Sequence, residues 1–262
     1  MRRWLGAAVL AALAACTALD AHVPPFARQP YEPFSRAGAI AIANDEWRLF
    51  GSRVDDAKPS SRPLPLPTEK AERQPGLWER IGEYWWLGQD AGTRFSRWTG
   101  KHDAKGQIFP ANKDGDFAWS AAFISYVMRE AGAGSLFPYA PDHAFYVDAG
   151  WHADREANPR YAVRAERPED YAPETGDLIC FGTGSASTLR FRDLPVPFFS
   201  GHCDIVTAVA PGELTVIGGN VDDAVTMKHV PTTPAGKLAT PDGQVVDPRY
   251  PWFVVVRVLY ER

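Results

Sequence analysis

The chain has 262 residues, of which 45% are hydrophobic and 12% aromatic, so it can bury a substantial core within one main domain. Its formal net charge is −4, and basic and acidic residues are scattered together along the chain. This composition excludes a chain that is disordered throughout, and the lack of a basic stripe argues against binding to nucleic acid.

The N-terminus has the pattern of an export signal. Met1-Arg2-Arg3 is followed by an apolar run over residues 4–15 that is too short to span a bilayer as a mature helix. The run ends in Leu13-Ala14-Ala15-Cys16, which resembles a bacterial lipobox, where the cysteine is diacylated and residues 1–15 are removed. We therefore predict an exported protein that is anchored in the cell envelope through acyl chains on Cys16.

The residues around Cys16 leave one alternative open and also indicate which membrane would hold the protein. The alternative is ordinary signal cleavage after Ala15 or Ala18, with Cys16 incidental. Thr17 rather than aspartate follows the cysteine, which in such lipoproteins favours transfer to the outer membrane, facing the periplasm, in a Gram-negative cell.

The mature chain begins with segments rich in proline. Residues 16–35 suit an extended tether. Helical spacing of apolar residues predicts a helix over residues 36–50, and residues 52–76 contain five prolines among polar residues, which is typical of a linker. We therefore treat residues 36–76 as an N-terminal helix and linker, and residues 77–262 as the main domain.

The main domain begins with helices and continues with strands. We predict helices over residues 77–87 and from about Asp116 to Gly132 or Gly134. Period-two patterns between turn residues predict five strands, at residues 177–181, 203–210, 213–217, 225–230 and 252–260. This order indicates an α+β fold in which helices precede a mainly antiparallel sheet.

Two cysteines remain once Cys16 is assigned to lipid. Cys180 ends one predicted strand and Cys203 lies in the next, so neighbouring strands could bring them within disulfide distance. Because exported proteins seldom keep unpaired cysteines, we predict a disulfide, the alternative being two buried free thiols.

Ser120 lies in the first turn of the predicted helix near Asp116. On a helical wheel it shares the inward face with Ile124 and Val127, while Ala122 and Ser125 fall on the opposite side. The N-terminus of a helix favours developing negative charge, but a hydroxyl also needs a general base within hydrogen-bond reach. Ser120 could instead simply cap its helix.

His202 is the candidate base, because it opens a predicted strand that could lie against the start of this helix. Asn220, at the end of the following strand, is our first choice for the group that orients the imidazole, and Asp222 is the second. Asp204 is less attractive because it lies only two residues away on the same strand, although on the same face. His202 and Asn220 could equally be ordinary strand-end and turn residues.

Four segments in order resemble the papain-like cell-wall hydrolases of the CHAP type. They are Trp119-Ser120-Ala121-Ala122-Phe123-Ile124-Ser125, Gly176-Asp177-Leu178-Ile179, Gly201-His202-Cys203-Asp204-Ile205-Val206 and Gly218-Gly219-Asn220. The nearest resemblance is to the domain-of-unknown-function family 2272, and it spans residues 77–260.

The resemblance implies a papain-like core and a hydrolase that cleaves an amide or peptide bond in peptidoglycan. It places the nucleophile at Ser120, the base at His202 and the orienting group at Asn220. Separately, we predict substrate contacts at Trp119 and at His143, because His143 follows the Ser120 helix closely enough to line the same cleft. Ser120 stands where the CHAP type has cysteine. The alternatives are an inactive peptidoglycan-binding or envelope-assembly lipoprotein, or an acyltransferase on the same fold.

No cofactor is implied, and the acidic residues and histidines between 142 and 154 do not have the spacing of a metal site.

The lipobox generates the first prediction. Cys16→Ala should release the protein from the membrane fraction, because acyl chains on the cysteine would be its anchor. Fractionation of the wild type and the variant, with acyl labelling, measures this. Unchanged fractionation together with an unlabelled wild type would contradict it.

Overall fold

The computed structural model describes residues 33–63, 66, 68–89, 107, 109–157 and 159–260. Its centre is an open seven-stranded sheet in the order β1-β6-β5-β4-β3-β7-β2. β1 runs parallel to β6, and every other neighbouring pair is antiparallel. The predicted α+β class, with helices before a mainly antiparallel sheet, is therefore confirmed.

The strands lie close to the predicted positions, and two short ones are additional. The two additional strands are β1 (Arg53–Val54) and β2 (Val163–Glu166). The five predicted strands are β3 (Leu178–Gly182), β4 (Gly201–Ala210), β5 (Glu213–Val221), β6 (Ala224–Pro231) and β7 (Trp252–Val258).

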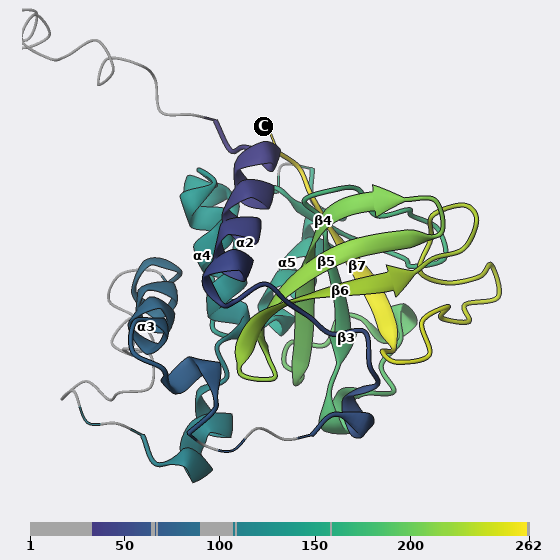
Figure 1. Ribbon diagram of the computed structural model, residues 1–262. Helices are drawn as coiled ribbons and strands as arrows, with labels where there is room; N and C mark the ends of the chain where they lie inside the picture. The colour runs from purple at the N-terminus through teal and green to yellow at the C-terminus, as the bar shows by residue number, and fades with distance from the viewer. Residues whose placement is uncertain are drawn as a thin grey trace, which may run out of the picture. The chain divides into compact units, whose positions relative to one another are not determined.

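Four α-helices lie in the described part of the chain, and Figure 1 shows α2, α3 and α4 grouped to one side of the sheet. They are α2 (Arg36–Leu49), α3 (Leu77–Leu87), α4 (Ser120–Glu130) and α5 (Ala144–Ala153). α2 starts where the Ser35 hydroxyl accepts a hydrogen bond from the Gly38 amide at 3.0 Å, as an N-cap does. A 3-10 helix over Ala111–Phe117 precedes α4, so the predicted start at Asp116 was four residues early.

Side chains of the central strands alternate between two hydrophobic clusters. Cys180, Cys203 and Val254 pack with the helices, whereas Ile179, Val206 and Val255 pack on the other face of the sheet. The loops that lead up to β7 help cover this second face, with Leu238 and Tyr250 in its cluster. The sheet is therefore buried on both sides, which is why β3 has no exposed residue.

Helix α4 is buried on both faces along its first nine residues, and this corrects the helical-wheel expectation of a two-sided helix. Every residue from Ser120 to Met128 is buried, including Ala122 and Ser125 on the side expected to face away from the core. That side meets α3, whose end comes so close that a Cβ on Gly88 would lie 2.7 Å from the Ala122 carbonyl oxygen. α2 and the strands β4 and β5 pack on α4 as well.

The segment placed before the main domain packs into the same compact unit, which spans residues 33–262. α2 contacts both α4 and β4, and β1 extends the sheet beside β6. Glu46 on α2 is buried and accepts hydrogen bonds from Tyr84 at 2.5 Å and from Arg80 Nε at 2.9 Å. These charge-assisted bonds fasten α2 to α3.

Cys180 and Cys203 form a disulfide, as predicted. The two cysteines are directly opposed in the register of the antiparallel strands β3 and β4.

The export signal, Cys16 and residues 17–32 of the predicted tether lie outside the described residues, whereas residues 33–35 lead directly into α2, with Phe34 buried in the core. Among the described helices, none has the length and hydrophobicity that a membrane span requires.

The disulfide generates the second prediction. Because the crosslink closes a loop between residues 23 apart in sequence, replacing both cysteines by serine should lower the free energy of unfolding by about 3 kcal/mol. Urea unfolding of the wild type and the double variant measures this. Titration of the denatured, unreduced wild type should find neither thiol free, and two reactive thiols there would overturn the prediction.

Candidate functional site

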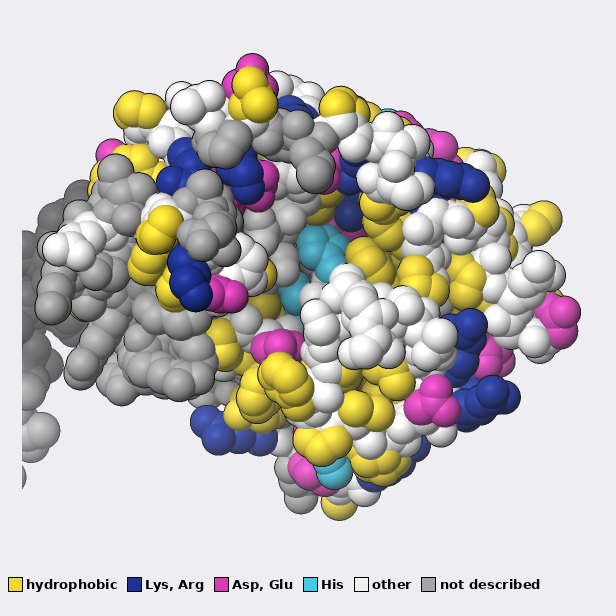
Figure 2. Space-filling model, turned by 90° about the horizontal axis from the view of Figure 1, so that it is seen from below, with side chains coloured by type: hydrophobic (Ala, Val, Ile, Leu, Met, Phe, Trp, Pro, Cys, Tyr) yellow, Lys and Arg dark blue, Asp and Glu magenta, His cyan; other side chains and the backbone are white. Residues whose placement is uncertain are grey.

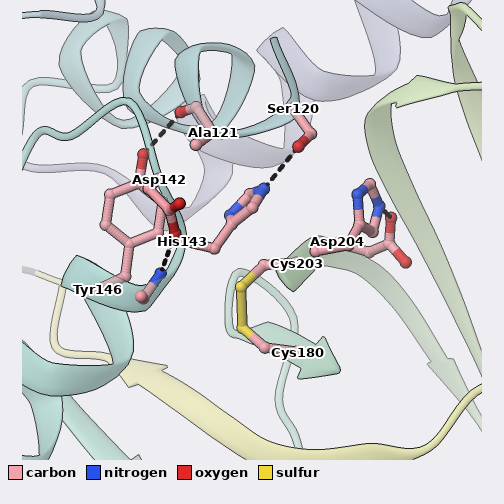
Figure 3. The surroundings of a disulfide bond; sticks show 10 residues. Ser120, Ala121, Asp142, His143, Tyr146, Cys180, Cys203 and Asp204 are labelled. Carbon is pink, nitrogen blue, oxygen red and sulfur yellow. Dashed lines mark hydrogen bonds and ion pairs between the residues drawn. A yellow bond between two sulfur atoms is a disulfide. The ribbon is translucent and has the colours of Figure 1, made fainter. Parts of the chain in front are cut away.

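Ser120 is the first residue of α4, and its hydroxyl does not cap the helix. Trp119 occupies the N-cap position and provides no side-chain capping bond. The Ser120 Oγ instead lies 2.8 Å from Nε2 of His143, a hydrogen bond that Figure 3 shows beside the disulfide. Helix geometry leaves the first-turn amides of α4 without partners inside the helix, so they favour negative charge next to this oxygen.

Trp119 holds the start of α4 in place from within the core. Its side chain is fully buried, and its indole N–H donates to Oε2 of Glu72, also buried, at 2.9 Å. Its ring packs against Phe50 and Tyr84. No part of the Trp119 side chain reaches an open surface. The structure therefore does not place Trp119 where it could contact a substrate, as the sequence had suggested.

His143 is the residue that immediately precedes α5, and its side chain is 2% exposed. Its ring lies edge-on to Tyr146, with ring centres 5.5 Å apart, and to His202, with ring centres 5.6 Å apart. Burial, together with the neighbouring His202, lowers the pKa of His143 well below its usual value of 6.5. His143 is therefore neutral at pH 7, and its buried Nδ1 has no hydrogen-bond partner among the described residues.

His202 opens β4 and is bonded to an acid on its own strand. Its Nε2 lies 2.9 Å from Oδ1 of Asp204, whose other oxygen lies 2.7 Å from Nζ of Lys228 on β6. Burial lowers the pKa of His202 despite the nearby carboxylate. Burial alone would raise the pKa of Asp204, but Lys228 and His202 lower it to about 2.

The alternation of β4 explains why Ser120 meets His143 and not His202. Cys203 packs in the cluster that contains α4, so His202 and Asp204 on either side of it point to the other face. His202 accordingly packs against Phe181, which belongs to the cluster on that second face. The rings of His143 and His202 meet near the start of β4.

The glycine pair in β5 makes room for both halves of the site. A Cβ on Gly218 would lie 1.8 Å from Oδ1 of Asp204 and 2.8 Å from Nε2 of His202. A Cβ on Gly219 would lie 2.5 Å from Cβ of Phe123 on α4. Only glycine at these two positions lets β5 pass between the acid and the helix.

Asn220 and Asp222 line a pocket of about 370 Å³ beside His202. Asp222 is paired with Arg62 at 2.8 Å, and no hydrogen bond joins Asn220 to His202. In the described structure the partner of His202 is therefore Asp204, the acid that sequence reasoning ranked below the other two. The face seen in Figure 2 is hollowed, with histidine side chains in the hollow and basic side chains beside it.

A family model described as "Uncharacterized protein conserved in bacteria (DUF2272)" matches residues 72–258. The chain belongs to this family. No curated protein and no solved structure matches the chain. The matched range of the DUF2272 family includes every residue of the candidate site, from Glu72 through Ser120 and His143 to Lys228.

The structure thus brings together most of the residues that the sequence singled out, in a different pairing. Ser120 and His143 form one hydrogen-bonded pair, and His202 with Asp204 and Lys228 forms an adjacent one. Lys228 carried no usable sequence signal, because a lysine in an alternating strand normally faces solvent. Within the described residues, no group of three or more histidine, cysteine or acidic side chains is placed to hold a metal ion.

The buried histidines generate the third prediction. Because the folded-state pKa of His143 lies below the unfolded value near 6.5, the unfolded chain binds a proton that the folded protein does not. Stability that is present above pH 6.5 should therefore be lost as the pH falls below it. His143→Gln should flatten this loss between pH 7.5 and pH 5, measured by urea unfolding at both values.

His152→Gln is the matched control, because His152 lies on α5 with its side chain half exposed. That variant should keep the wild-type pH dependence. An unchanged slope in the His143 variant would show that His143 titrates normally.

Proposed function

We propose that this member of the DUF2272 family is an exported, lipid-anchored hydrolase that cleaves an amide or peptide bond of peptidoglycan, with Ser120 as the nucleophile. The observation that carries the proposal is the 2.8 Å contact between the Ser120 hydroxyl and a buried, neutral imidazole at the N-terminus of a helix. A serine hydroxyl becomes a useful nucleophile when such a base accepts its proton.

The reaction follows from this contact. Ser120 Oγ attacks the carbonyl carbon of the substrate while its proton passes to Nε2 of His143. The first-turn amides of α4 stabilise the resulting oxyanion. The imidazolium then gives its proton to the leaving amine, which leaves an acyl ester on Ser120. Water hydrolyses this ester, and His143 takes the proton of the water and returns it to the Ser120 oxygen.

His143 replaces His202 as the proposed base for Ser120, since the hydroxyl contacts His143 directly. The ionised Asp204 lies near enough to favour a positive charge on His143 when the proton arrives. His202 and its acid therefore support the site from the neighbouring face of β4, and Asn220 contributes to the wall of the pocket.

The nature of the substrate rests on the sequence. The ordered motifs resemble those of CHAP-type hydrolases, and the lipobox ending at Cys16 would tether the domain in the envelope, where peptidoglycan lies. No cofactor enters the proposed reaction, because serine, imidazole and water supply every atom and proton.

One observation favours the second candidate, a peptidoglycan-binding lipoprotein without catalysis. Ser120 is 8% exposed, and the described residues offer His143 Nδ1 no carboxylate partner of the kind that holds a catalytic imidazole. A site retained only for binding would need neither an open hydroxyl nor a third member.

The fourth prediction separates these two functions. Ser120→Ala and His143→Gln should each lower the rate of labelling by a fluorophosphonate, and of peptidoglycan cleavage, by at least about 100-fold, because each removes one half of the proton transfer. Rates measured on the full-length protein in detergent test this. His202→Gln should lower the labelling rate less than His143→Gln.

Ser125→Ala is the matched control, since Ser125 lies on α4, is buried and is bonded to Tyr146. It should lose stability but keep labelling. A wild type that binds peptidoglycan yet neither labels nor cleaves would favour the binding lipoprotein. Loss of labelling in His202→Gln but not in His143→Gln would return the role of base to His202.

A further inference from the structure

Lys228 is a charged side chain almost completely removed from water. It is 1% exposed, and its ammonium group pairs with Asp204, which is fully buried. The rings of Tyr250 and Trp252 lie 4.9 Å and 5.9 Å from its Nζ. Burying two charges costs several kcal/mol each, so hydrophobic residues of similar size would serve packing as well or better.

The ammonium group decides the protonation state of Asp204. With Lys228 and His202 beside it, the pKa of Asp204 falls to about 2 against the effect of burial, so the carboxylate is ionised at any physiological pH. An ionised carboxylate can only accept hydrogen bonds. The hydrogen between Asp204 Oδ1 and His202 Nε2 therefore belongs to the imidazole.

We propose that Lys228 is a positioning residue that acts through Asp204 to hold His202 in its neutral tautomer with the proton on Nε2. A neutral imidazole has one N–H, so Nδ1 is then a free acceptor. His202 Nδ1 has no hydrogen-bond partner among the described residues, and His202 lines the pocket. The chain Lys228–Asp204–His202 thus fixes the chemistry that the imidazole offers to a ligand.

The ligand group complementary to this acceptor is a donor, such as an amide N–H, a hydroxyl or a water molecule. This assignment of a substrate contact rests on the proposed function, whereas the tautomer itself does not. Gly218 supports the arrangement, because any Cβ there would displace Asp204 and His202 together.

Several other charged or titratable groups lie around His202 and could also affect its protonation. His143 faces it from the start of α5, and four further groups line the same pocket, namely Arg62, Asp222, Arg249 and Tyr250. Arg62 and Arg249 are held by the acids Asp55, Asp222, Asp247 and Asp56. Asp204 is the one acid among these groups that is bonded to the His202 ring.

The test is imidazole NMR of the full-length protein in detergent, labelled with ¹⁵N-histidine, in which two-bond correlations distinguish the two tautomers and the imidazolium. Loss of peaks in His202→Gln assigns the ring. We expect the Nε2–H tautomer in the wild type at pH 7. In Lys228→Met, which keeps the apolar stem, the uncompensated carboxylate should stabilise the imidazolium and raise the titration midpoint by about one pH unit or more.

Lys228→Arg should keep the wild-type tautomer and titration midpoint, because it retains a positive charge beside Asp204. Lys237→Met should also leave both unchanged, since Lys237 is half-exposed and has no ion pair among the described residues. An Nδ1–H tautomer in the wild type would overturn the proposal even if Lys228→Met fails to fold. A folded Lys228→Met with unchanged tautomer and midpoint would also overturn it. If these NMR expectations hold but the wild type never labels or cleaves, the hydrolase fails while the role of Lys228 stands.

Discussion

The enclosure of α4 is the constraint on which the remaining structure depends. The sheet, α2 and α3 cover α4 so that every residue from Ser120 to Met128 is buried, and its N-terminus brings Ser120 against His143. Trp119 and Gly88 make this possible, one by anchoring the start of the helix to Glu72 and the other by letting α3 approach the backbone of α4. Ser120 is consequently fixed in position by elements that are distant in sequence.

Buried charged side chains join secondary-structure elements at two places in this fold. Glu46 joins α2 to α3 through Arg80 and Tyr84, and Asp204 joins β4 to β6 through Lys228. Such pairs seldom add much net stability, but each penalises any arrangement in which one partner is buried alone. We infer that they select one packing of the helices and sheet over competing compact ones.

The sequence was sufficient for the fold class and for all five main strands, because strand alternation and turn residues are local signals. It also supported the disulfide. It did not reveal β1, β2 or α5, which are two to ten residues long and are stabilised by contacts with distant strands. The position of Ser120 was predicted, but its exposure and its partner depend on how α3, α4 and α5 pack.

The pairing of the histidines shows most clearly what could not be predicted from the sequence. Sequence order suggested that the histidine at the start of β4 meets Ser120, yet alternation turns His202 toward Asp204 on the other face of the sheet. The spacing of two residues between His202 and Asp204 did contain this information. The burial of Lys228 could not be predicted, since it depends on packing against Asp204, Tyr250 and Trp252 from other parts of the chain.

The Cys180–Cys203 bridge has a consequence for strand slippage. Moving β4 by one residue along β3 would exchange the faces of Cys203 and His202, placing sulfur in the pocket and the imidazole against the helices. Backbone hydrogen bonds alone permit such a shift at the cost of side-chain packing, whereas a covalent link between directly opposed residues forbids it. In an oxidising compartment, the crosslink therefore determines which side chain the pocket contains.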